Sequence, residues 1–106
     1  MHPVKRIEII ASSMEQRKIV DCLEKCQVNG YSVIRDVTGR SDRGVVSDDF
    51  DLAGSTLSNI YIISFCGADQ AKAVVAQLRP ILNQYGGTCY LSDAMEIRSM
   101  NCVSTI

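Results

Sequence analysis

Apolar positions along the chain follow two different periods, which predict strands and helices in alternation. Residues 4–11, 31–37 and 57–66 are rich in β-branched side chains and lie between turn residues, as strands do. A short fourth strand is predicted at 88–91, and one more short strand around 96–98. In the two intervening segments apolar residues recur every three or four positions, which predicts helices.

The first predicted helix starts after Ser12 and Ser13, because Glu15 and Gln16 follow three residues later and give a capping box in either register. Asn29 and Gly30 are expected to end this helix, since both tolerate the left-handed conformation. Its buried stripe is predicted to contain Met14, Ile19, Val20, Leu23 and Cys26.

The second predicted helix opens at 67–69, with Asp69 as the candidate cap. Pro80 lies inside its apolar pattern and is expected to kink or divide the helix. Tyr85, Gly86 and Gly87 form a turn before the next strand. The buried stripe is predicted to contain Ala71, Val74, Val75, Leu78 and Leu82.

The order strand–helix–strand, long loop, strand–helix–strand predicts an α+β ferredoxin-like βαββαβ fold. Its sheet is antiparallel and both helices cover one face. The 106 residues fit a single domain, 1–106. Residues 38–58 are rich in Gly, Ser and Asp and show no sustained period. A loop of that length in a small domain is usually functional or disordered.

Charge and hydropathy narrow the range of partners. The net charge is −1, and eleven basic residues are scattered among twelve acidic ones. A nucleic-acid-binding protein usually carries a basic stripe, so nucleic acid is not the expected partner. No apolar run approaches the roughly 20 residues of a membrane span. No secretory signal is recognised, so we expect a cytoplasmic protein without direct membrane insertion.

Five cysteines do not form a recognised metal motif. Cys22 and Cys26 share one helix face, but a metal site would need further ligands and His2 is the only histidine. Reduced, mostly buried thiols are the simpler interpretation. Cys102, near the C-terminus, is the candidate for an exposed, oxidisable thiol, and whether any cysteine is redox-active stays open.

An alternative function is a small ferredoxin-like enzyme or metal-handling protein that uses Cys22 and Cys26. Its other candidate site is an acidic cluster in the long loop, formed by Asp48, Asp49 and Asp51. Charges in a loop are usually just solvated. With one histidine, a Cys/His or Ser/His catalytic pair is hard to build.

Two glycine-containing turns and several arginines predict phosphate binding. The segment 38–44 reads T-G-R-S-D-R-G directly after a strand, and Gly86, Gly87 and Thr88 form a second turn. Glycines let backbone amides approach a phosphate, and arginines donate paired hydrogen bonds. Turn formation alone is the competing explanation for each glycine.

The order of these motifs resembles the P-II signalling proteins. The strand G-Y-S-V-I at 30–34 leads into the Gly/Arg segment at 39–44, and a long loop and an apolar strand follow. In that family the long loop is the T-loop, here about 39–58. The turn at 85–88 has the place of the B-loop, and E-I-R at 96–98 is similar to the E-x-R segment of the family. The tail is 99–106.

The resemblance implies a homotrimeric regulator, not an enzyme, with adenine nucleotides in clefts between subunits and a target protein bound through the T-loop. It implies no metal and no prosthetic group. By position, the adenine side is Ser32 with the backbone near Ile63 and Ser64. The phosphate side is Gly39, Arg40, Ser41 and Arg43 at the T-loop base, Gly86, Gly87 and Thr88 in the B-loop, and Arg98 from the tail.

Three family features are missing from this sequence. No lysine follows the B-loop glycines, and the T-loop contains neither the magnesium-binding glutamine nor the tyrosine that is uridylylated. The chain therefore resembles the divergent branch linked to bicarbonate transporters and carboxysomes. This branch implies AMP, ADP or cyclic AMP as effector, little gain from the third phosphate of ATP, and bicarbonate as a candidate second effector.

Overall fold

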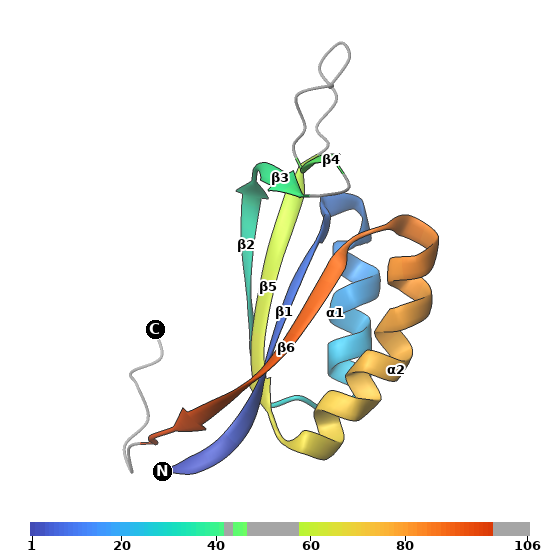
Figure 1. Cartoon of the computed structure of the whole chain (residues 1–106). Helices are drawn as coiled ribbons and strands as arrows, with labels where there is room; N and C mark the ends of the chain where they lie inside the picture. Colours follow the sequence, from blue (N-terminus) through green and yellow to red (C-terminus); the bar gives the residue numbers. More distant parts are fainter. Residues whose placement is uncertain (42–43, 47–57, 99–106) are drawn as a thin grey trace, which may run out of the picture.

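A four-stranded antiparallel sheet carries both helices on one of its faces (Figure 1). The structure is a computed structural model, and it describes residues 1–41, 44–46 and 58–98. This architecture confirms the predicted α+β ferredoxin-like fold. The strand order in the sheet is β2-β5-β1-β6, so β2 and β6 are the two edges.

The strands of the main sheet are β1 (His2–Ser12), β2 (Tyr31–Val37), β5 (Asn59–Cys66) and β6 (Thr88–Glu96). β1 is central and pairs antiparallel with β5 on one side and with β6 on the other. Its Ile9 lies opposite Ile62 of β5. The helical elements are a single 3-10 turn, η1 (Ser13–Glu15), followed by α1 (Gln16–Lys25), and the long α2 (Ala68–Tyr85).

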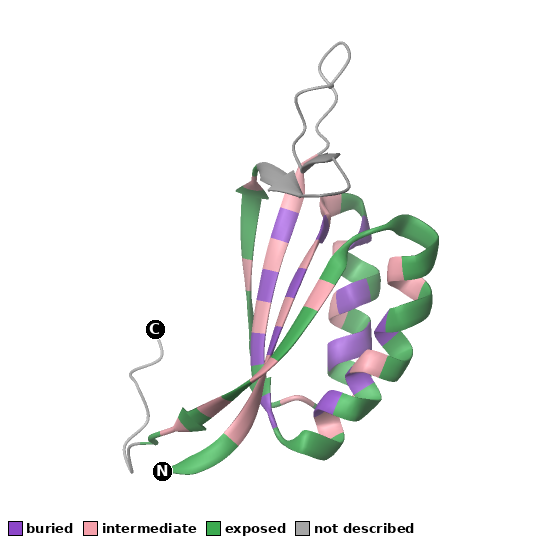
Figure 2. Cartoon of the chain, in the orientation of Figure 1, coloured by how far each residue is buried: buried purple, intermediate pink, exposed green. Residues whose placement is uncertain are grey.

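The core lies between the sheet and the helices (Figure 2). On β5 the buried residues alternate with partly exposed ones, because successive side chains of a strand point to opposite faces. The fully buried members include Ile7, Ile62, Leu23, Val74 and Leu78, contributed by both central strands and both helices. Within the described residues, the opposite face of the sheet has no helix on it.

The start of the first helix differs from the predicted capping box. The Ser12 hydroxyl accepts a hydrogen bond from the amide of Met14, and the Ser13 hydroxyl accepts one from the amide of Ser58. The Glu15 carboxylate pairs with Lys18 and so does not reach back to a cap. The first turn is η1, which turns Met14 out of the stripe and leaves it 66% exposed.

The helix boundaries also correct two expectations. α1 ends at Lys25, not at Asn29-Gly30, because Gln27 already adopts the left-handed conformation, with φ 58°. α2 has Gly67 as its N-cap instead of Asp69. The amide of Gly67 donates to the side-chain oxygen of Gln70, which supplies the cap.

Pro80 does not divide α2, which runs unbroken from Ala68 to Tyr85. The carbonyl that loses its intrahelical donor belongs to Ala76, four residues earlier, and both residues lie on the exposed side of the helix. Water can satisfy that carbonyl, so the helix continues. The two short strands expected near the C-terminus are one strand, β6, which pairs with β1 from Thr88 to Glu96.

Within the predicted long loop, β3 (Gly39–Ser41) and β4 (Gly44–Val46) form a small two-stranded sheet. The loop prediction had no strand there, since a pattern of three residues is too short to show a period. Arg43, the acidic cluster Asp48, Asp49 and Asp51, the tail 99–106 and its Cys102 lie outside the described residues. In the described part, neither helix has both the length and the apolarity to cross a membrane.

Candidate functional site

Exposed apolar side chains gather on the face of the sheet that the helices leave uncovered. They come from all four strands, and the most exposed are Ile34 at 52%, Phe65 at 44% and Tyr90 at 57%. Strand register places Ile10 opposite Tyr61 and Glu8 opposite both Ile63 and Tyr90 on the same face. We call this surface the open face; it is formed by Ile10, Ile34, Tyr61, Ile63, Phe65 and Tyr90.

The predicted adenine-side residues lie where β2 begins. Ser32 and Ile63 are directly paired across β2 and β5, and both belong to the side of the sheet without helices. Ser64 points the other way and is buried. Its hydroxyl donates a hydrogen bond of 2.6 Å to the carbonyl of Gly30, which fixes the start of β2 and leaves only the backbone of Ser64 for a ligand.

Arg98 lies at the same end of the sheet, just beyond the end of β6. Its guanidinium donates to one oxygen of Glu96 at 2.9 Å, and the His2 ring nitrogen lies 2.7 Å from the other oxygen. The hydrogen bond from Arg98 is the main reason that the pKa of Glu96 is lowered. A hollow of about 280 Å³ beside this cluster is also lined by Asn29 and Phe65, so Arg98 faces the region where β2 begins.

The turn between α2 and β6 lies at the other end of the sheet, which is also the end that carries the T-loop base (Figure 1). Gly86 and Gly87 have φ of 88° and 118°, which favours glycine at both positions. The amide of Gly86 donates to Leu82 and caps α2. Thr88 follows as the exposed first residue of β6, paired with Ile10.

Gly87 is required by the fold itself. A Cβ atom there would lie 2.8 Å from the carbonyl oxygen of Ile10 and 3.0 Å from the side chain of Leu82. From the sequence, a glycine was expected here only because it lets backbone amides approach a phosphate. The close approach of Gly87 to β1 is a second reason why a glycine is needed at this position. A large substitution there therefore tests folding as well as ligand binding.

The T-loop base also lies at this end. β2 ends at Val37, which pairs with Asn59 of β5. After one intervening residue, Gly39, Arg40 and Ser41 form β3. Gly39 pairs with Val46 of β4. The structure thus describes the backbone of three of the four predicted T-loop-base residues, the fourth being Arg43.

The candidate residues therefore form two groups, and Arg98 of one copy lies far from the second group of the same copy. The first group is Ser32, Ile63, Ser64 and Arg98, and the second is Gly39, Arg40, Ser41, Gly86, Gly87 and Thr88. The separation is largest for Arg98, because β6 alone separates Thr88 from Glu96 by eight steps, or about 27 Å at 3.3–3.4 Å per residue, whereas Ile63 lies in register with Tyr90, two steps from Thr88. A single adenine nucleotide cannot span from one end of this strand to the other.

Sequence reasoning missed the partners of Arg98. The sequence presents Glu96 only as part of a motif and His2 only as a residue near the terminus. His2 is instead the first residue of β1, and the antiparallel register places it opposite Glu96. No spacing along the sequence connects residues 94 positions apart, so only the strand pairing could reveal this cluster.

The alternative site at Cys22 and Cys26 lacks the features of a reactive or metal-binding centre. Burial raises the pKa of the Cys22 thiol to about 11, which disfavours the thiolate needed for either role. The Cys22 sulfur lies 3.8 Å from the carbonyl of Val74. Across the described ranges, no three His, Cys, Asp or Glu side chains gather as a metal site would require.

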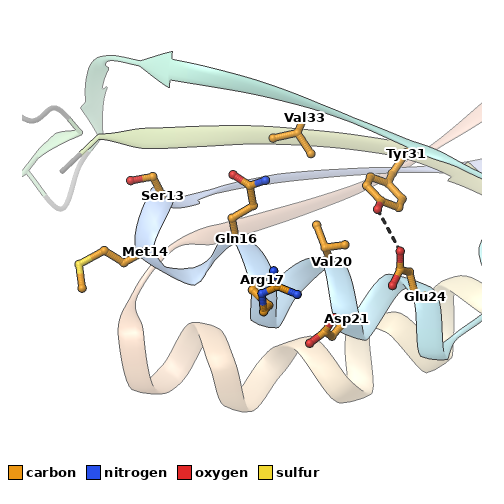
Figure 3. A pocket seen from close by; sticks show the side chains of 9 residues that line it. All are labelled: Ser13, Met14, Gln16, Arg17, Val20, Asp21, Glu24, Tyr31 and Val33. Atoms are coloured by element: carbon orange, nitrogen blue, oxygen red, sulfur yellow. Dashed lines mark hydrogen bonds between the residues drawn. The ribbon is translucent and has the colours of Figure 1, made fainter. Parts of the chain in front are cut away.

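Figure 3 shows a further groove, of about 450 Å³, between α1 and the edge strand β2. Gln16, Val20 and Val33 point toward it, and a hydrogen bond of 3.2 Å from Tyr31 to Glu24 crosses one end. None of the residues predicted for nucleotide binding lines it. The groove is therefore separate from both groups.

Comparison with known proteins identifies the family of this chain. The family model described as nitrogen regulatory protein P-II matches residues 4–101. A comparison with curated proteins finds no match for the sequence.

Solved structures with the same fold include several PII-like proteins. CPII, a nitrogen regulatory PII-like protein from Thiomonas intermedia K12 bound to ADP, AMP and bicarbonate, has a TM-score of 0.80 at 20% identity, covering 92% of this chain and 91% of CPII. A PII-like signalling protein from Thermus thermophilus has a TM-score of 0.68 at 18% identity, with 91% and 90% covered. A DUF3240 family protein from Shewanella baltica has a TM-score of 0.63 at 18% identity, with 98% and 100% covered.

Proposed function

Because the chain belongs to the nitrogen regulatory protein P-II family, we propose that it is a homotrimeric signal-transduction regulator that binds adenine nucleotides in clefts between its subunits. Proteins of this family are signalling regulators, and nothing in the described part of the chain favours catalysis instead. The whole chain, 1–106, acts as one P-II-like domain.

The separation of the two residue groups is the observation that carries this proposal. Arg98 and the start of β2 lie at one end of the sheet, whereas the T-loop base and the turn at Gly86 lie at the other. A head-to-tail contact brings the first group of one copy next to the second group of its neighbour. Such contacts are heterologous, and they close into a ring when the rotation allows it. Each contact then forms one nucleotide site.

The open face supports an assembly of this kind. A small soluble domain rarely leaves so many large apolar side chains together on one surface unless another surface covers them. Three copies that turn these faces toward a common axis would bury them. This packing would also add to the modest core that a domain of 106 residues builds alone.

ADP and AMP are the nucleotides that we expect to bind best, with cyclic AMP and ATP as further candidates. Arg43 and Arg98 are the proposed phosphate ligands, and no lysine follows Gly87 to hold a third phosphate. CPII, whose fold this chain shares, binds ADP, AMP and bicarbonate. Bicarbonate is accordingly the second effector that we propose to test.

We further propose that the T-loop, about residues 39–58, binds a target protein in inorganic-carbon uptake or metabolism, such as a bicarbonate transporter. The missing glutamine, tyrosine and lysine support the divergent branch of the family over the nitrogen-sensing branch. The fold shared with CPII agrees with this assignment. A cytoplasmic location follows from the same proposal.

Light scattering coupled to gel filtration, followed by calorimetry, tests this function. We expect a particle with three times the mass of the chain that binds ADP and AMP, with ATP gaining less than tenfold over ADP. Calorimetry with and without bicarbonate then tests the second effector. A monomer that ignores all four nucleotides would overturn the proposal. A hundredfold preference for ATP, or about 2.7 kcal/mol, would instead indicate the nitrogen-sensing branch.

A further inference from the structure

A cluster of polar groups lies in the middle of the open face. The Tyr61 hydroxyl donates to one oxygen of Glu8 at 2.5 Å, and Nε of Arg6 lies 3.3 Å from the other oxygen. The same Nε donates to the Ser92 hydroxyl at 3.0 Å. The cluster thus joins β1, β5 and β6 across the centre of the sheet, and we call Arg6, Glu8 and Tyr61 the central cluster.

Hydrogen bonds within the chain hold the central cluster in place, but they do not use all of its donors and acceptors. A guanidinium offers five donors, and in the described part of the chain only Nε of Arg6 is engaged. A carboxylate offers about four acceptor positions, of which Glu8 uses two. The side chains of Arg6 and Glu8 are 42% and 27% exposed in the single chain, so their remaining hydrogen-bonding capacity faces outward.

This surface is complementary to itself. It carries one cation and one anion within hydrogen-bonding distance, surrounded by Ile63, Phe65 and Tyr90. When two copies bring their open faces together, a like-charged contact is repulsive, whereas Arg6 of one copy beside Glu8 of the next is attractive. Burial makes this difference larger, because water no longer screens the charges.

We propose that the central cluster forms Arg6–Glu8 contacts between copies of this chain and thereby fixes the single register in which the open faces assemble. The inference rests on the proposed function, since it requires the open face to be buried between copies. Apolar side chains supply the stability of such a face but tolerate several registers. A buried polar pair accepts one arrangement, and it excludes chains that do not carry matching charges.

Charge-reversed chains test the proposal. Arg6→Glu leaves only acidic groups in the cluster, and Glu8→Arg leaves only basic groups. Each variant alone should dissociate on the order of a hundredfold more readily than the parent assembly, because like charges then meet across the interface. In an equimolar mixture, native mass spectrometry should find mixed assemblies in clear excess over the share that random mixing predicts.

Lys5→Glu is the matched control, because Lys5 lies on the same strand but on the helix side, where it pairs with Asp93. It should assemble like the parent. Should a single reversal fail to fold, the double variant Arg6→Glu/Glu8→Arg keeps both charges within the chain. It should assemble with itself but join parent chains less often than random mixing predicts.

Single variants that assemble as tightly as the parent would overturn the register proposal, and so would random mixing of the double variant with the parent. A parent chain that is monomeric would overturn the proposed trimer as well. If the parent is a trimer that binds ADP while the charge reversals change nothing, only the register proposal fails.

Discussion

At the scale of single residues, the same few side chains hold the fold and form the candidate site. Arg98 is oriented by Glu96, which also binds His2, so the proposed phosphate ligand is anchored to the first strand. Ser64 contributes its hydroxyl to the backbone of Gly30 and leaves the ligand only its main chain. Gly87 lies against β1, and its absent side chain is a condition of packing.

Arg98→Ala should weaken ADP binding by roughly tenfold to a hundredfold, because a charge-assisted hydrogen bond to a phosphate contributes about 1.5–3 kcal/mol. Calorimetry measures the affinity, and a thermal melt confirms that the variant is folded. Arg79→Ala is the matched control, since Arg79 is an exposed arginine of α2, outside both groups. Parent-like affinity of the folded Arg98→Ala trimer would remove Arg98 from the site.

Gly87→Ala should lower the free energy of unfolding by about 1–3 kcal/mol, because it combines a left-handed φ with a contact of 2.8 Å to the Ile10 carbonyl. Gly30→Ala is the control, since Gly30 does not have a positive φ and a methyl group added there would meet no atom within 4 Å. Denaturant unfolding of both variants checks the difference. Equal stability of the two would show that the turn can relax.

At the scale of elements, the sequence predicts those features that depend on a repeated pattern. Runs of β-branched residues predict the strand β2 at 31–37 and the apolar face of β5. Apolar residues that recur every three or four positions predict the two helices. Features decided by one contact were not predictable. Gln27 ends α1 early, Pro80 is tolerated because it faces water, and β6 stays continuous because β1 pairs along its whole length.

The same limit applies to the candidate site. Short motifs identified the glycine turn, the start of β2 and Arg98, but no local pattern places these segments at opposite ends of the sheet. That separation depends on strand direction and register, which are set by pairing between residues far apart in the chain. The central cluster of Arg6, Glu8 and Tyr61 could not be predicted for the same reason, since it joins strands whose residues are more than fifty positions apart in the sequence.

The contact between the ends of β1 and β6 should depend on pH. The Arg98 hydrogen bond lowers the pKa of Glu96 in the folded chain, so this contribution to stability is present above the ordinary carboxyl pKa of about 4.3. This contribution to stability is lost as the pH falls through the lowered pKa of Glu96 in the folded chain. The melting temperature of the parent should therefore exceed that of Glu96→Gln at pH 7, and the difference should shrink as the pH falls below the ordinary carboxyl pKa. A difference that does not change with pH would contradict this assignment.

At the scale of the whole molecule, the proposed function makes a single copy of the chain an incomplete binding protein. Its sheet has a covered face that forms the core and an open face that carries exposed aromatic and aliphatic side chains. Arg98 and the glycine turn lie at opposite ends of that sheet. The proposed assembly explains both features, because copies of the chain would then complete each other's sites.

Complementation between two defective variants tests this central claim most directly. Arg98→Ala damages the first group, and Arg43→Ala removes the other proposed phosphate ligand, which the family resemblance assigns to the T-loop base, so each variant alone should bind ADP roughly tenfold to a hundredfold more weakly. In a ring of three, every mixed trimer contains one contact between an intact first group and an intact second group. Calorimetry on trimers reassembled from both variants should therefore recover a parent-like affinity at one site per mixed trimer. Mixed trimers, verified by native mass spectrometry, that bind ADP only as weakly as the single variants would show that each site lies within one chain.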